Sequence, residues 1–445
     1  MEIKLKNIDI EDTQLDLVRE QLSLYLRTLD KIDNTEKDLN IVSLFSGCGG
    51  MDLGFEGGFL AHRKSISEKS FNSFAQKETD DLYVKLKPTR FKTVFANDIL
   101  KDARNAWVHN FSKNNYKPEV FHTESIVNLV KLHELGLEVF PKKVDVVTGG
   151  FPCQDFSIAG KRNGFNSHRK HDGKLFNGDL PTEESRGKLY YWMKRVIEIT
   201  EPKIFIAENV KGLVNLSDVK EIIQKDFASA NGNGYIVLEP QVLHSANYGV
   251  PQSRERVIFI GIKKSELSPK ALKELSKKNV SKEYNPYPPI THTQDSYVSL
   301  NDILRDVEEP DNSNDISQLN YSKAKFMGKH CQGQSEVNLK GIGPTIRAEH
   351  HGNIEFRRLS VENGGRYVDE LSSGKKERRL TVRECGLIQS FPPDFDFVVK
   401  SDEPRKKFLI SPSQAYKIIG NAVPPLMAYN LAKRIENLWD KFFKM

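Results

Sequence analysis

Short apolar runs recur along the chain from residue 41, and polar or glycine-rich turns separate them from helix-like segments. Each run has about the length of a buried strand. The runs are residues 41–45 (IVSLF), 93–96 (TVFA), 144–147 (VDVV), 204–207 (IFIA) and 256–260 (RVIFI). Helical patterns lie between several of them, for example at residues 188–199. Strands that alternate with helices predict an α/β fold with a doubly wound, mostly parallel sheet and helices on both faces.

The pattern changes on both sides of this region. Residues 1–38 are charged, carry apolar residues at helical spacing, and predict an N-terminal helical extension. After Lys263 the regularity fades into a stretch rich in Ser, Asn, Lys, Pro and Gly. We therefore expect a first domain over residues 39–264 and 412–445, and a smaller irregular domain over 265–411. Residues 416–439 are predicted to form a strand, a turn and a helix that close the first domain.

Composition places the chain among globular intracellular proteins. It has 445 residues, of which 38% are hydrophobic and 28% charged, as is usual for folded domains. No run approaches the roughly 20 apolar residues that span a bilayer, and the first residues lack a secretory signal. We therefore expect a cytoplasmic protein without membrane contact. The four cysteines form no Cys-x-x-Cys pair, which argues against zinc and disulfides. The net charge of +6 permits nucleic-acid binding without establishing it.

Four of the apolar runs end in conspicuous turns, at residues 46–50, 97–98, 149–154 and 208–209. Because the carboxyl ends of parallel strands meet at one edge, where ligands bind, we expect these turns to share one crevice. In residues 45–54 (FSGCGGMDLG) the glycines allow a ligand close to the backbone, and the following helix N-terminus favours a negative group. A nicotinamide dinucleotide is a weaker candidate, because Asp52 replaces the third glycine of G-x-G-x-x-G.

Two single residues in these turns carry chemistry. Asp98 can accept hydrogen bonds from the ribose hydroxyls of an adenosine, or it can cap a helix over residues 99–111. Cys153 follows a strand, behind two glycines and a proline, in residues 149–157 (GGFPCQDFS). A lone cysteine is usually a small buried hydrophobe. A turn of this kind, however, exposes the thiol in one orientation, as a nucleophile requires.

From about residue 41 to the C-terminus, the chain resembles the cytosine carbon-5 DNA methyltransferases of bacterial restriction-modification systems. Six segments resemble the motifs of that family and follow their order. They are residues 45–50 (FSGCGG), 150–154 (GFPCQ), 208–210 (ENV), 252–256 (QSRER), 379–384 (RLTVRE) and 420–425 (GNAVPP). The resemblance implies a Rossmann-like catalytic domain, with residues 265–411 as a target-recognition domain.

The resemblance also implies the reaction, in which a methyl group moves from S-adenosylmethionine to carbon 5 of a cytosine in DNA. The Cys153 thiolate would add to carbon 6 of the ring, which makes carbon 5 nucleophilic. Glu208 would hold N3 of the ring protonated. Arg254 and Arg256 would share one face of a strand, and at least one of them would donate to the cytosine O2.

The same resemblance implies the residues that hold the cofactor. Asp98 would bind the ribose and Glu124 the adenine amino group. The remaining predicted cofactor residues are Phe45, Gly47, Cys48, Gly50, Pro152, Asn421 and Val423. The chain departs from the family pattern at two positions. The ribose acid of the family is usually Glu where this chain has Asp98, and the next residue is often aromatic where this chain has Ile99.

Double-stranded DNA is the predicted partner, and its target base must be flipped out of the helix. Residues 160–187 form a long basic segment that suits phosphate contact and closure over DNA. The same positive charge would repel a cation, so His168 and His171 do not predict a metal site. In the second domain, residues 345–353 (TIRAEHHGN) and 356–358 (FRR) offer base-edge and phosphate donors.

Two alternatives remain at this point. An RNA cytosine methyltransferase would use the same chemistry, but the chain carries residues 383–392 (RECGLIQSFP) in place of the Cys-Phe-Thr signature of the tRNA-modifying branch. A catalytically silent DNA-binding relative would keep the fold, but Cys153, Glu208 and the arginine pair are intact. We expect the modification enzyme of a restriction-modification system, acting as a monomer, with a cognate restriction endonuclease encoded alongside.

Overall fold

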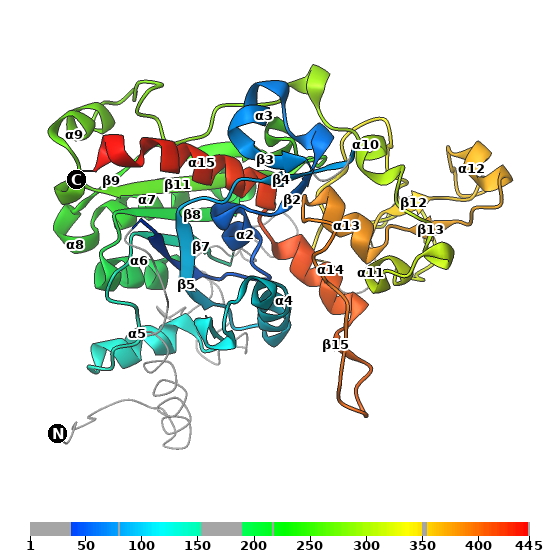
Figure 1. Ribbon diagram of the computed structural model, residues 1–445, viewed down its shortest axis with the longest axis horizontal. Coiled ribbons are helices and arrows are strands. Elements are labelled where there is room, and N and C mark those ends of the chain that lie inside the picture. Colours follow the sequence, from blue (N-terminus) through cyan, green and yellow to red (C-terminus); the bar gives the residue numbers. More distant parts are fainter. Residues whose placement is uncertain (1–36, 79–80, 153–188, 216–217, 349–353, 444–445) are drawn as a thin grey trace.

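The computed structural model describes residues 37–78, 81–152, 189–215, 218–348 and 354–443. Within these ranges, a large sheet covered by helices lies beside a smaller part with few regular elements (Figure 1). Most of the expected N-terminal extension, Cys153 and the basic segment 160–187 lie outside the described residues. In the part of the chain that the structure describes, no helix combines the length and the apolarity needed to cross a membrane.

The large sheet has eight strands and is mostly parallel, as predicted. Its main path runs in the order β10-β11-β8-β7-β1-β5-β6, and β9 pairs with β11. The parallel strands are β1 (Leu39–Leu44), β5 (Phe91–Asn97), β6 (Phe121–His122), β7 (Val146–Gly150) and β8 (Ile204–Val210). The antiparallel strands are β9 (Tyr235–Val237), β10 (Gln241–His244) and β11 (Glu255–Lys263). The strand order reverses between β1 and β7, which is the place where sheets of this type bind ligands.

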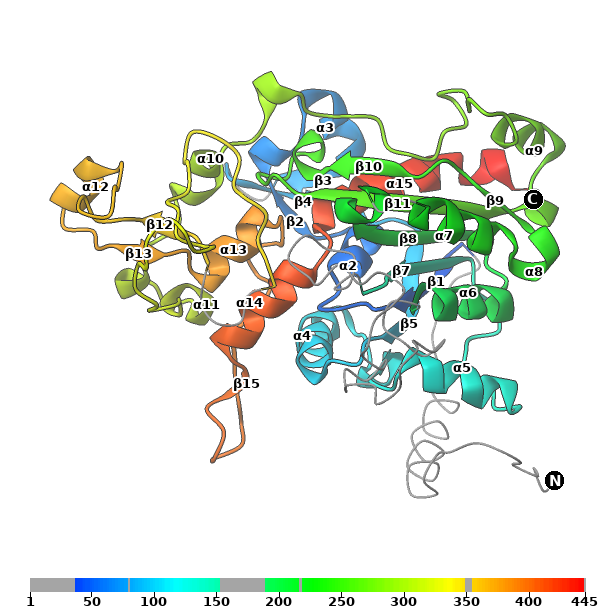
Figure 2. The same cartoon turned by 180° about the vertical axis from the view of Figure 1, so that it is seen from behind.

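Helices cover both faces of this sheet, because successive strand residues point to opposite faces. In β8, Ile204 and Ile206 join one apolar cluster, while Phe205 and Ala207 join the other. The first cluster includes residues of α2 (Gly50–Glu56), α4 (Lys101–Phe111) and α15 (Pro425–Phe442). The second includes residues of α5 (Ile126–Glu134), α6 (Leu189–Thr200) and α7 (Val219–Ala228). Figure 2 shows α5, α6 and α7 from behind.

A smaller three-stranded sheet follows α2 and packs beside α15. Its order is β2-β4-β3, and all pairs are antiparallel. The elements are β2 (Leu60–His62), α3 (Glu68–Phe74), β3 (Ala75–Glu78) and β4 (Tyr83–Leu86). Tyr429 of α15 contacts this unit through the rings of Phe59 and Phe74. The sheet therefore extends the apolar cluster that covers one face of the large sheet.

The expected strand-turn-helix over residues 416–439 is wrong at its first element. The structure has a helix there, α14 (Pro412–Asn421), followed by a turn and α15. Ser411 caps α14 through a capping box with Gln414, and Pro412 occupies the first turn. The run Tyr416 to Ile419 is short and mostly apolar, and the pattern of such a run cannot distinguish a helix from a strand.

The second domain is smaller and irregular, as predicted, and lies to one side of the large sheet (Figures 1 and 2). Its elements are α10 (Leu300–Leu304), α11 (Ile316–Leu319), β12 (Phe356–Arg358), α12 (Val368–Ser372), β13 (Arg378–Arg379), α13 (Val382–Ile388), β14 (Val399–Lys400) and β15 (Phe408–Ile410). The first elements after residue 264 pack elsewhere. The backbone next to α9 (Pro269–Leu275) bonds to the end of α15, where Ser268 N donates to Phe442 O at 2.8 Å. The domain boundary at residue 264 stays a prediction.

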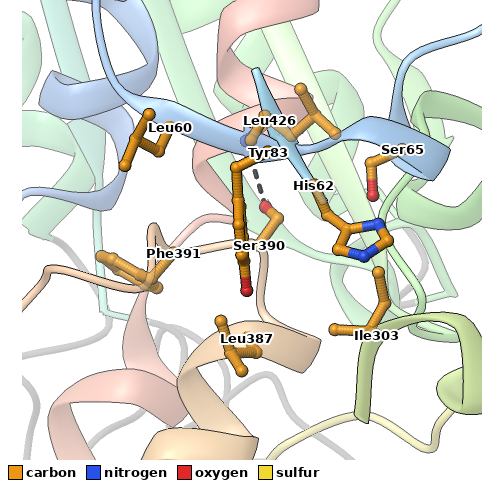
Figure 3. A pocket seen from close by; sticks show the side chains of 10 residues that line it. Leu60, His62, Ser65, Tyr83, Ile303, Leu387, Ser390, Phe391 and Leu426 are labelled. Atoms are coloured by element: carbon orange, nitrogen blue, oxygen red, sulfur yellow. Dashed lines mark hydrogen bonds between the residues drawn. The ribbon is translucent and has the colours of Figure 1, made fainter. Parts of the chain in front are cut away.

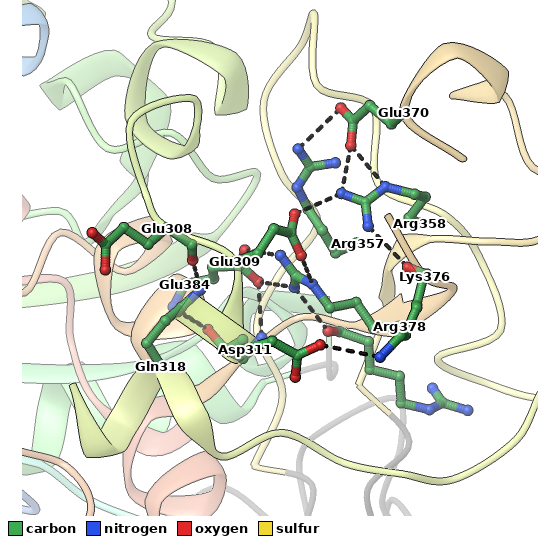
Figure 4. A network of polar contacts seen from close by, with 12 residues as sticks. Glu308, Glu309, Asp311, Gln318, Arg357, Arg358, Glu370, Lys376, Arg378 and Glu384 are labelled. Carbon is green, nitrogen blue, oxygen red and sulfur yellow. Dashed lines mark hydrogen bonds and ion pairs between the residues drawn. The ribbon is translucent and has the colours of Figure 1, made fainter. Parts of the chain in front are cut away.

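Buried arginines hold the second domain together (Figure 4). Arg358 is fully buried and pairs with Glu309 and Glu370 at 2.8 and 2.5 Å. Arg378 makes two bonds to Glu384, at 2.8 and 2.9 Å, and a third contact with Glu309. Because a buried charge is costly unless it is paired and hydrogen-bonded, these contacts determine how β12, β13 and α13 pack.

Removing one charge from this network should destabilise the domain. Glu384 has a side chain only 1% exposed. We expect Glu384→Gln to lower the free energy of unfolding by about 3–5 kcal/mol, because it leaves the Arg378 charge buried without its main partner. Urea denaturation followed by circular dichroism would measure the change. Lys376→Gln, which removes an exposed pair with Asp311 in the same network, is the matched control and should leave the midpoint unchanged. Equal midpoints for wild type and Glu384→Gln would contradict the expectation.

A second buried carboxylate belongs to the first turn of α2. Asp52 is 1% exposed and accepts hydrogen bonds from the Ser43 hydroxyl at 2.5 Å and from Trp107 Nε1 at 2.8 Å. Burial raises the pKa of Asp52 from 3.8 to about 7, although both hydrogen bonds lower it. Between these two pH values the folded protein keeps a proton that the unfolded chain has released. The contribution of Asp52 to stability therefore falls as the pH rises from 3.8 and is lost above about pH 7.

Asp52→Asn removes this titration. We expect the free energy of unfolding of the variant to rise relative to wild type by about 2–3 kcal/mol between pH 5 and 7, at about 1.4 kcal/mol per pH unit. Urea denaturation at pH 5, 6, 7 and 8 would measure the difference. The exposed residue Asp402 supplies the control variant, Asp402→Asn, whose curve should run parallel to that of wild type. Parallel curves for Asp52→Asn as well would show that Asp52 is not the titrating group.

Candidate active site

The four predicted turns lie along one edge of the large sheet. In the parallel register, Leu44 pairs with Asn97 on one side and with Gly149 on the other, and Gly150 pairs with Glu208. The carboxyl ends of β1, β5, β7 and β8 are therefore neighbours. This confirms that the polar turns after these strands meet at one edge.

The glycine-rich turn after β1 is bonded to the turn after β5. Gly47 N donates to Asp98 Oδ2 at 3.0 Å, and Leu100 N donates to Asp98 Oδ1 at 2.9 Å. The N-cap of α4 is Leu100, so Asp98 is not the helix cap that the sequence also allowed. Instead its carboxylate connects two turns. Phe45 has a positive φ of 53°, which carries the chain sharply out of β1 into the glycine turn.

The turn after α14 packs directly on this glycine turn. A Cβ on Gly50 would lie 2.3 Å from the Val423 carbonyl oxygen, so only glycine allows the contact. The structure thus brings together Gly50 and Val423, which lie far apart in the chain. Asn421 is exposed beside them, and Pro152 is half-buried. Cys48 differs from its predicted neighbours. Its thiol lies in the core and donates to Ile418 O at 3.6 Å, and burial raises its pKa.

Glu124 offers an unused acceptor near the end of β6. Its Oε2 is buried and makes no hydrogen bond among the described residues. This atom lies 3.9 Å from His122 Nδ1. Burial lowers the pKa of His122 to about 3, so the imidazole is neutral at pH 7 and the contact is not an ion pair. The residue after Asp98 in the chain is Ile99, whose apolar side chain is 43% exposed.

Glu208 and Arg256 form a pair at the same edge. Arg256 Nε lies 2.8 Å from Glu208 Oε1, and both side chains are nearly buried. β8 and β11 are antiparallel neighbours, with Arg256 opposite Val210 and Ile258 opposite Glu208. The Glu208 carboxylate lies over the backbone of Gly150, where a Cβ would be 2.8 Å from Oε2. The absence of a side chain at Gly150 therefore leaves room for the Glu208 carboxylate at the end of β7.

The residue after Glu208 bonds to the chain just before Cys153. Asn209 Nδ2 donates to the Phe151 carbonyl at 3.1 Å, and the bond is buried. The sequence placed Asn209 in a motif but did not single it out as a site residue. Its signal is its position next to Glu208, because an amide at a strand end can bond to the neighbouring strand. Cys153 itself, two residues after Phe151, lies outside the described residues.

The two arginines of the residue 252–256 motif do different things. Arg254 precedes β11, and its guanidinium donates to the carbonyls of Ile346 and Gly420 at 3.1 and 3.0 Å. Arg256 lies beside Glu208. The expected shared strand face is wrong for Arg254, which lies before the strand, and a hydrogen bond from either arginine to the cytosine O2 stays a prediction. Sequence spacing did not distinguish them, because it cannot show which acceptors lie near a buried guanidinium.

The predicted donors of the second domain are mostly occupied. Arg357 and Arg358 were expected to offer donors to DNA, but both side chains are buried and paired with Glu370. That expectation is wrong. The segment 356–358 alone does not show that Glu370, which lies further along the chain, pairs with both arginines. The Thr345 hydroxyl donates to Ser253 O. Arg347 pairs with Glu355 at 2.9 Å and keeps a side chain 31% exposed. Residues 349–353 lie outside the described ranges.

A small cavity lies between the three-stranded sheet, α13 and α15 (Figure 3). Its volume is about 20 Å³, and Leu60, His62, Tyr83, Leu387 and Phe391 contribute to its wall. That volume suits one water molecule and is far too small for a nucleoside. The cavity is therefore not a cofactor site.

Known proteins are similar to this chain in sequence, and others are similar to it in fold. The type II methyltransferase M.BsuRI of Bacillus subtilis is 30% identical over 421 residues, which cover 93% of this chain and 82% of that protein. M.BspRI of Lysinibacillus sphaericus is 29% identical over 93% of this chain and 85% of that protein. Two solved structures have the same fold. DNMT2 of Spodoptera frugiperda, in a mutant form, has a TM-score of 0.52 at 17% identity and covers 89% of this chain and 99% of its own. EhMeth of Entamoeba histolytica has a TM-score of 0.53 at 15% identity and covers 91% and 99%.

A family model points the same way. The model for C-5 cytosine-specific DNA methylases matches residues 39–437. This range includes every strand of the large sheet and both segments that meet at Gly50 and Val423. The chain belongs to the family of C-5 cytosine-specific DNA methylases.

Proposed function

We propose that this protein is the modification enzyme of a type II restriction-modification system, which methylates carbon 5 of a flipped cytosine in duplex DNA with S-adenosylmethionine as donor. The observation that carries the proposal is the Glu208–Arg256 pair, at 2.8 Å, beside the strand end that leads to Cys153. The relatives M.BsuRI and M.BspRI are type II methyltransferases, which supports the restriction-modification setting.

The residues at the sheet edge fit S-adenosylmethionine. Glu124 Oε2 is a buried acceptor that lacks a hydrogen bond within the described residues, and an adenine amino group is a donor that would satisfy it. The exposed face of Ile99 offers apolar contact to a base next to Asp98. Asp98 keeps lone pairs for ribose hydroxyls, because a carboxylate accepts about four hydrogen bonds and two are used. The exposed Asn421 and the backbone of Val423 lie beside Gly50, where the methionine end would bind.

The Cys48 sulfur is packed in the core, so Cys48 would contribute to this binding only through its backbone. Phe45, Gly47 and Gly50 would bind through their backbone and through the space that the glycines leave. When bound, S-adenosylmethionine supplies an electrophilic methyl group. All other steps fall to residues of the chain.

In the proposed reaction, the Cys153 thiolate forms a bond to carbon 6 of the cytosine, and the ring electrons move toward carbon 5 and N3. Glu208 holds a proton at N3, so the ring does not carry a full negative charge. Arg256 holds the Glu208 carboxylate in place through Nε. A guanidinium has five N–H donors, so Arg256 can also donate to the cytosine O2. After methyl transfer, carbon 5 loses its proton to a base, the ring electrons return and the bond to sulfur breaks.

The Asn209–Phe151 bond would determine where the Cys153 turn begins. It joins the strand of Glu208 to the backbone two residues before the thiol. The acid and the nucleophile would then keep a constant separation while DNA enters. Duplex DNA would bind between the two domains, with the basic residues 160–187 at its phosphates. A monomer in the cytoplasm, with a restriction endonuclease encoded alongside, completes the proposal.

Bisulfite sequencing of plasmid DNA from cells that express the chain would test this function and identify the target sequence. We expect Cys153→Ser to abolish methylation, because a hydroxyl is too weak a nucleophile to add to carbon 6. The variant should still bind S-adenosylhomocysteine within about twofold of wild type. DNA that contains 5-fluorocytosine should be trapped covalently by wild type alone. Methylation of tRNA in place of duplex DNA, or full turnover by Cys153→Ser, would sink the proposal.

The adenine contact can be tested separately. We expect Glu124→Ala to weaken S-adenosylhomocysteine binding roughly tenfold, because a hydrogen bond to a charged group contributes about 1.5 kcal/mol. Isothermal titration calorimetry would measure the dissociation constant. S-inosylhomocysteine has an oxygen in place of the amino group. Wild type and Glu124→Ala should therefore bind S-inosylhomocysteine with similar dissociation constants. If Glu124→Ala weakens both ligands equally, Glu124 does not read the amino group.

A further inference from the structure

Three consecutive residues join parts of the chain that lie far apart in sequence. Gln252, Ser253 and Arg254 run alongside residues 343–346 of the second domain. Ser253 N donates to Gly343 O at 2.7 Å, Gly343 N donates to Pro251 O at 2.9 Å, and Gln252 forms a parallel bridge with Gly343. The two segments thus pair like short strands, although neither belongs to a sheet.

Ile346 is held at both of its backbone polar groups. Its carbonyl accepts a hydrogen bond from Arg254 Nη1 at 3.1 Å, and its N–H donates to Gln252 Oε1 at 3.1 Å. Ile346 itself is fully buried. It stands directly before Arg347 and Ala348, where the chain enters residues 349–353 of the second domain.

The same two side chains reach the turn that carries Asn421. Arg254 Nη2 donates to Gly420 O at 3.0 Å. Gln252 Nε2 donates to Gln389 Oε1 at 2.5 Å, and Gln389 Nε2 donates to Ala422 O at 2.6 Å. The residues on both sides of Asn421 are therefore bonded, directly or through one side chain, to the residues that hold Ile346.

Gly420 shows how closely these segments approach each other. A Cβ at this position would lie 2.1 Å from the Arg347 carbonyl carbon and 2.3 Å from Ala348 N. The backbone of the second domain thus touches the end of α14 with no space for a side chain. This close backbone contact and the hydrogen bond from Arg254 involve the same residue, Gly420.

We propose that Gln252 and Arg254 couple the two binding sites, so that residues 345–348 of the second domain and the turn around Asn421 move as one unit. Arg254 is then a positioning residue that does not touch the base. The inference rests on the proposed function, in which the second domain contacts DNA and Asn421 contacts the cofactor. A cofactor that orders the Asn421 turn would also order residues 345–348 of the second domain, and each ligand would tighten the binding of the other.

The burial of Arg254 makes the connection stiff. Arg254 is only 1% exposed, so water does not solvate its guanidinium. The hydrogen bonds to two carbonyls take the place of that solvation. Arg434 provides a comparison within the same chain. It is half-buried on α15 and donates to the carbonyls of Asn285 and Lys282 at 2.8 and 2.5 Å. Both of these carbonyls belong to one neighbouring stretch, so Arg434 joins neither proposed binding site to the other.

The test measures the ratio of two dissociation constants for S-adenosylhomocysteine, without and with a saturating duplex that contains the target found by bisulfite sequencing. We expect wild type to bind at least about fivefold more tightly with the duplex present. Arg254→Met and Gly420→Ala should bring this ratio to about one. Arg254→Met removes the hydrogen bonds to Ile346 and Gly420, whereas Gly420→Ala adds a side chain where two backbones touch. If one of these variants does not fold, the other still tests the proposal. Arg434→Met is the matched control and should keep the wild-type ratio even if its unfolding midpoint falls.

A purely structural role for Arg254 would lower stability and leave the ratio intact. Such a result with folded Arg254→Met would overturn the inference alone, as would a wild-type ratio of one. If wild type binds no S-adenosylhomocysteine and methylates no DNA, the proposed function fails first. Arg256→Gln separates the two arginines. It should lower kcat at least about a hundredfold and keep the ratio, because Arg256 acts at the reacting base.

Discussion

The parallel pairing of β1 with β5 and β7 is the constraint on which the site depends. It places the ends of four strands side by side, so residues that are far apart in sequence meet without a dedicated scaffold. The glycine turn, Asp98, the approach to Cys153 and Glu208 each take their place from a strand end. The antiparallel strand β11 then brings Arg256 to Glu208 from the opposite direction. Local loop structure adds detail to an arrangement that the sheet already determines.

Much of this could be predicted from sequence, because buried parallel strands are short apolar runs that end in recognisable turns. The five predicted runs all appear as strands of the large sheet. The errors have physical causes. The run Tyr416 to Ile419 has the composition of a strand, but the capping residues before it start a helix. Arg254 and Arg256 have the same spacing as any period-two pair, and only their distant acceptors give them different roles. No local pattern reveals such acceptors.

The second domain shows the same limit more strongly. Its few short strands and helices leave many backbone groups that need other partners. Arg379 meets several of these needs, since its guanidinium donates to the carbonyls of Ala324, Lys325, Gly333 and Ile354. The Arg379 guanidinium also lies over the ring of Phe356, with its central carbon 4.0 Å from the ring centroid, which adds a cation–π interaction. The sequence indicated donors for DNA in residues 345–353 and 356–358, because an arginine is usually exposed. Here several arginines are the interior of the domain.

The acceptors of Arg254 and Arg379 have a consequence for how this architecture can change over time. Both guanidinium groups bind main-chain oxygens, which every amino acid supplies. Replacing the side chains of the surrounding segments therefore leaves the anchoring points intact, provided that the course of the backbone is kept. The side chains on the surface of a domain held in this way can therefore change while its attachment to the rest of the chain stays the same. New binding preferences then require no redesign of the junction.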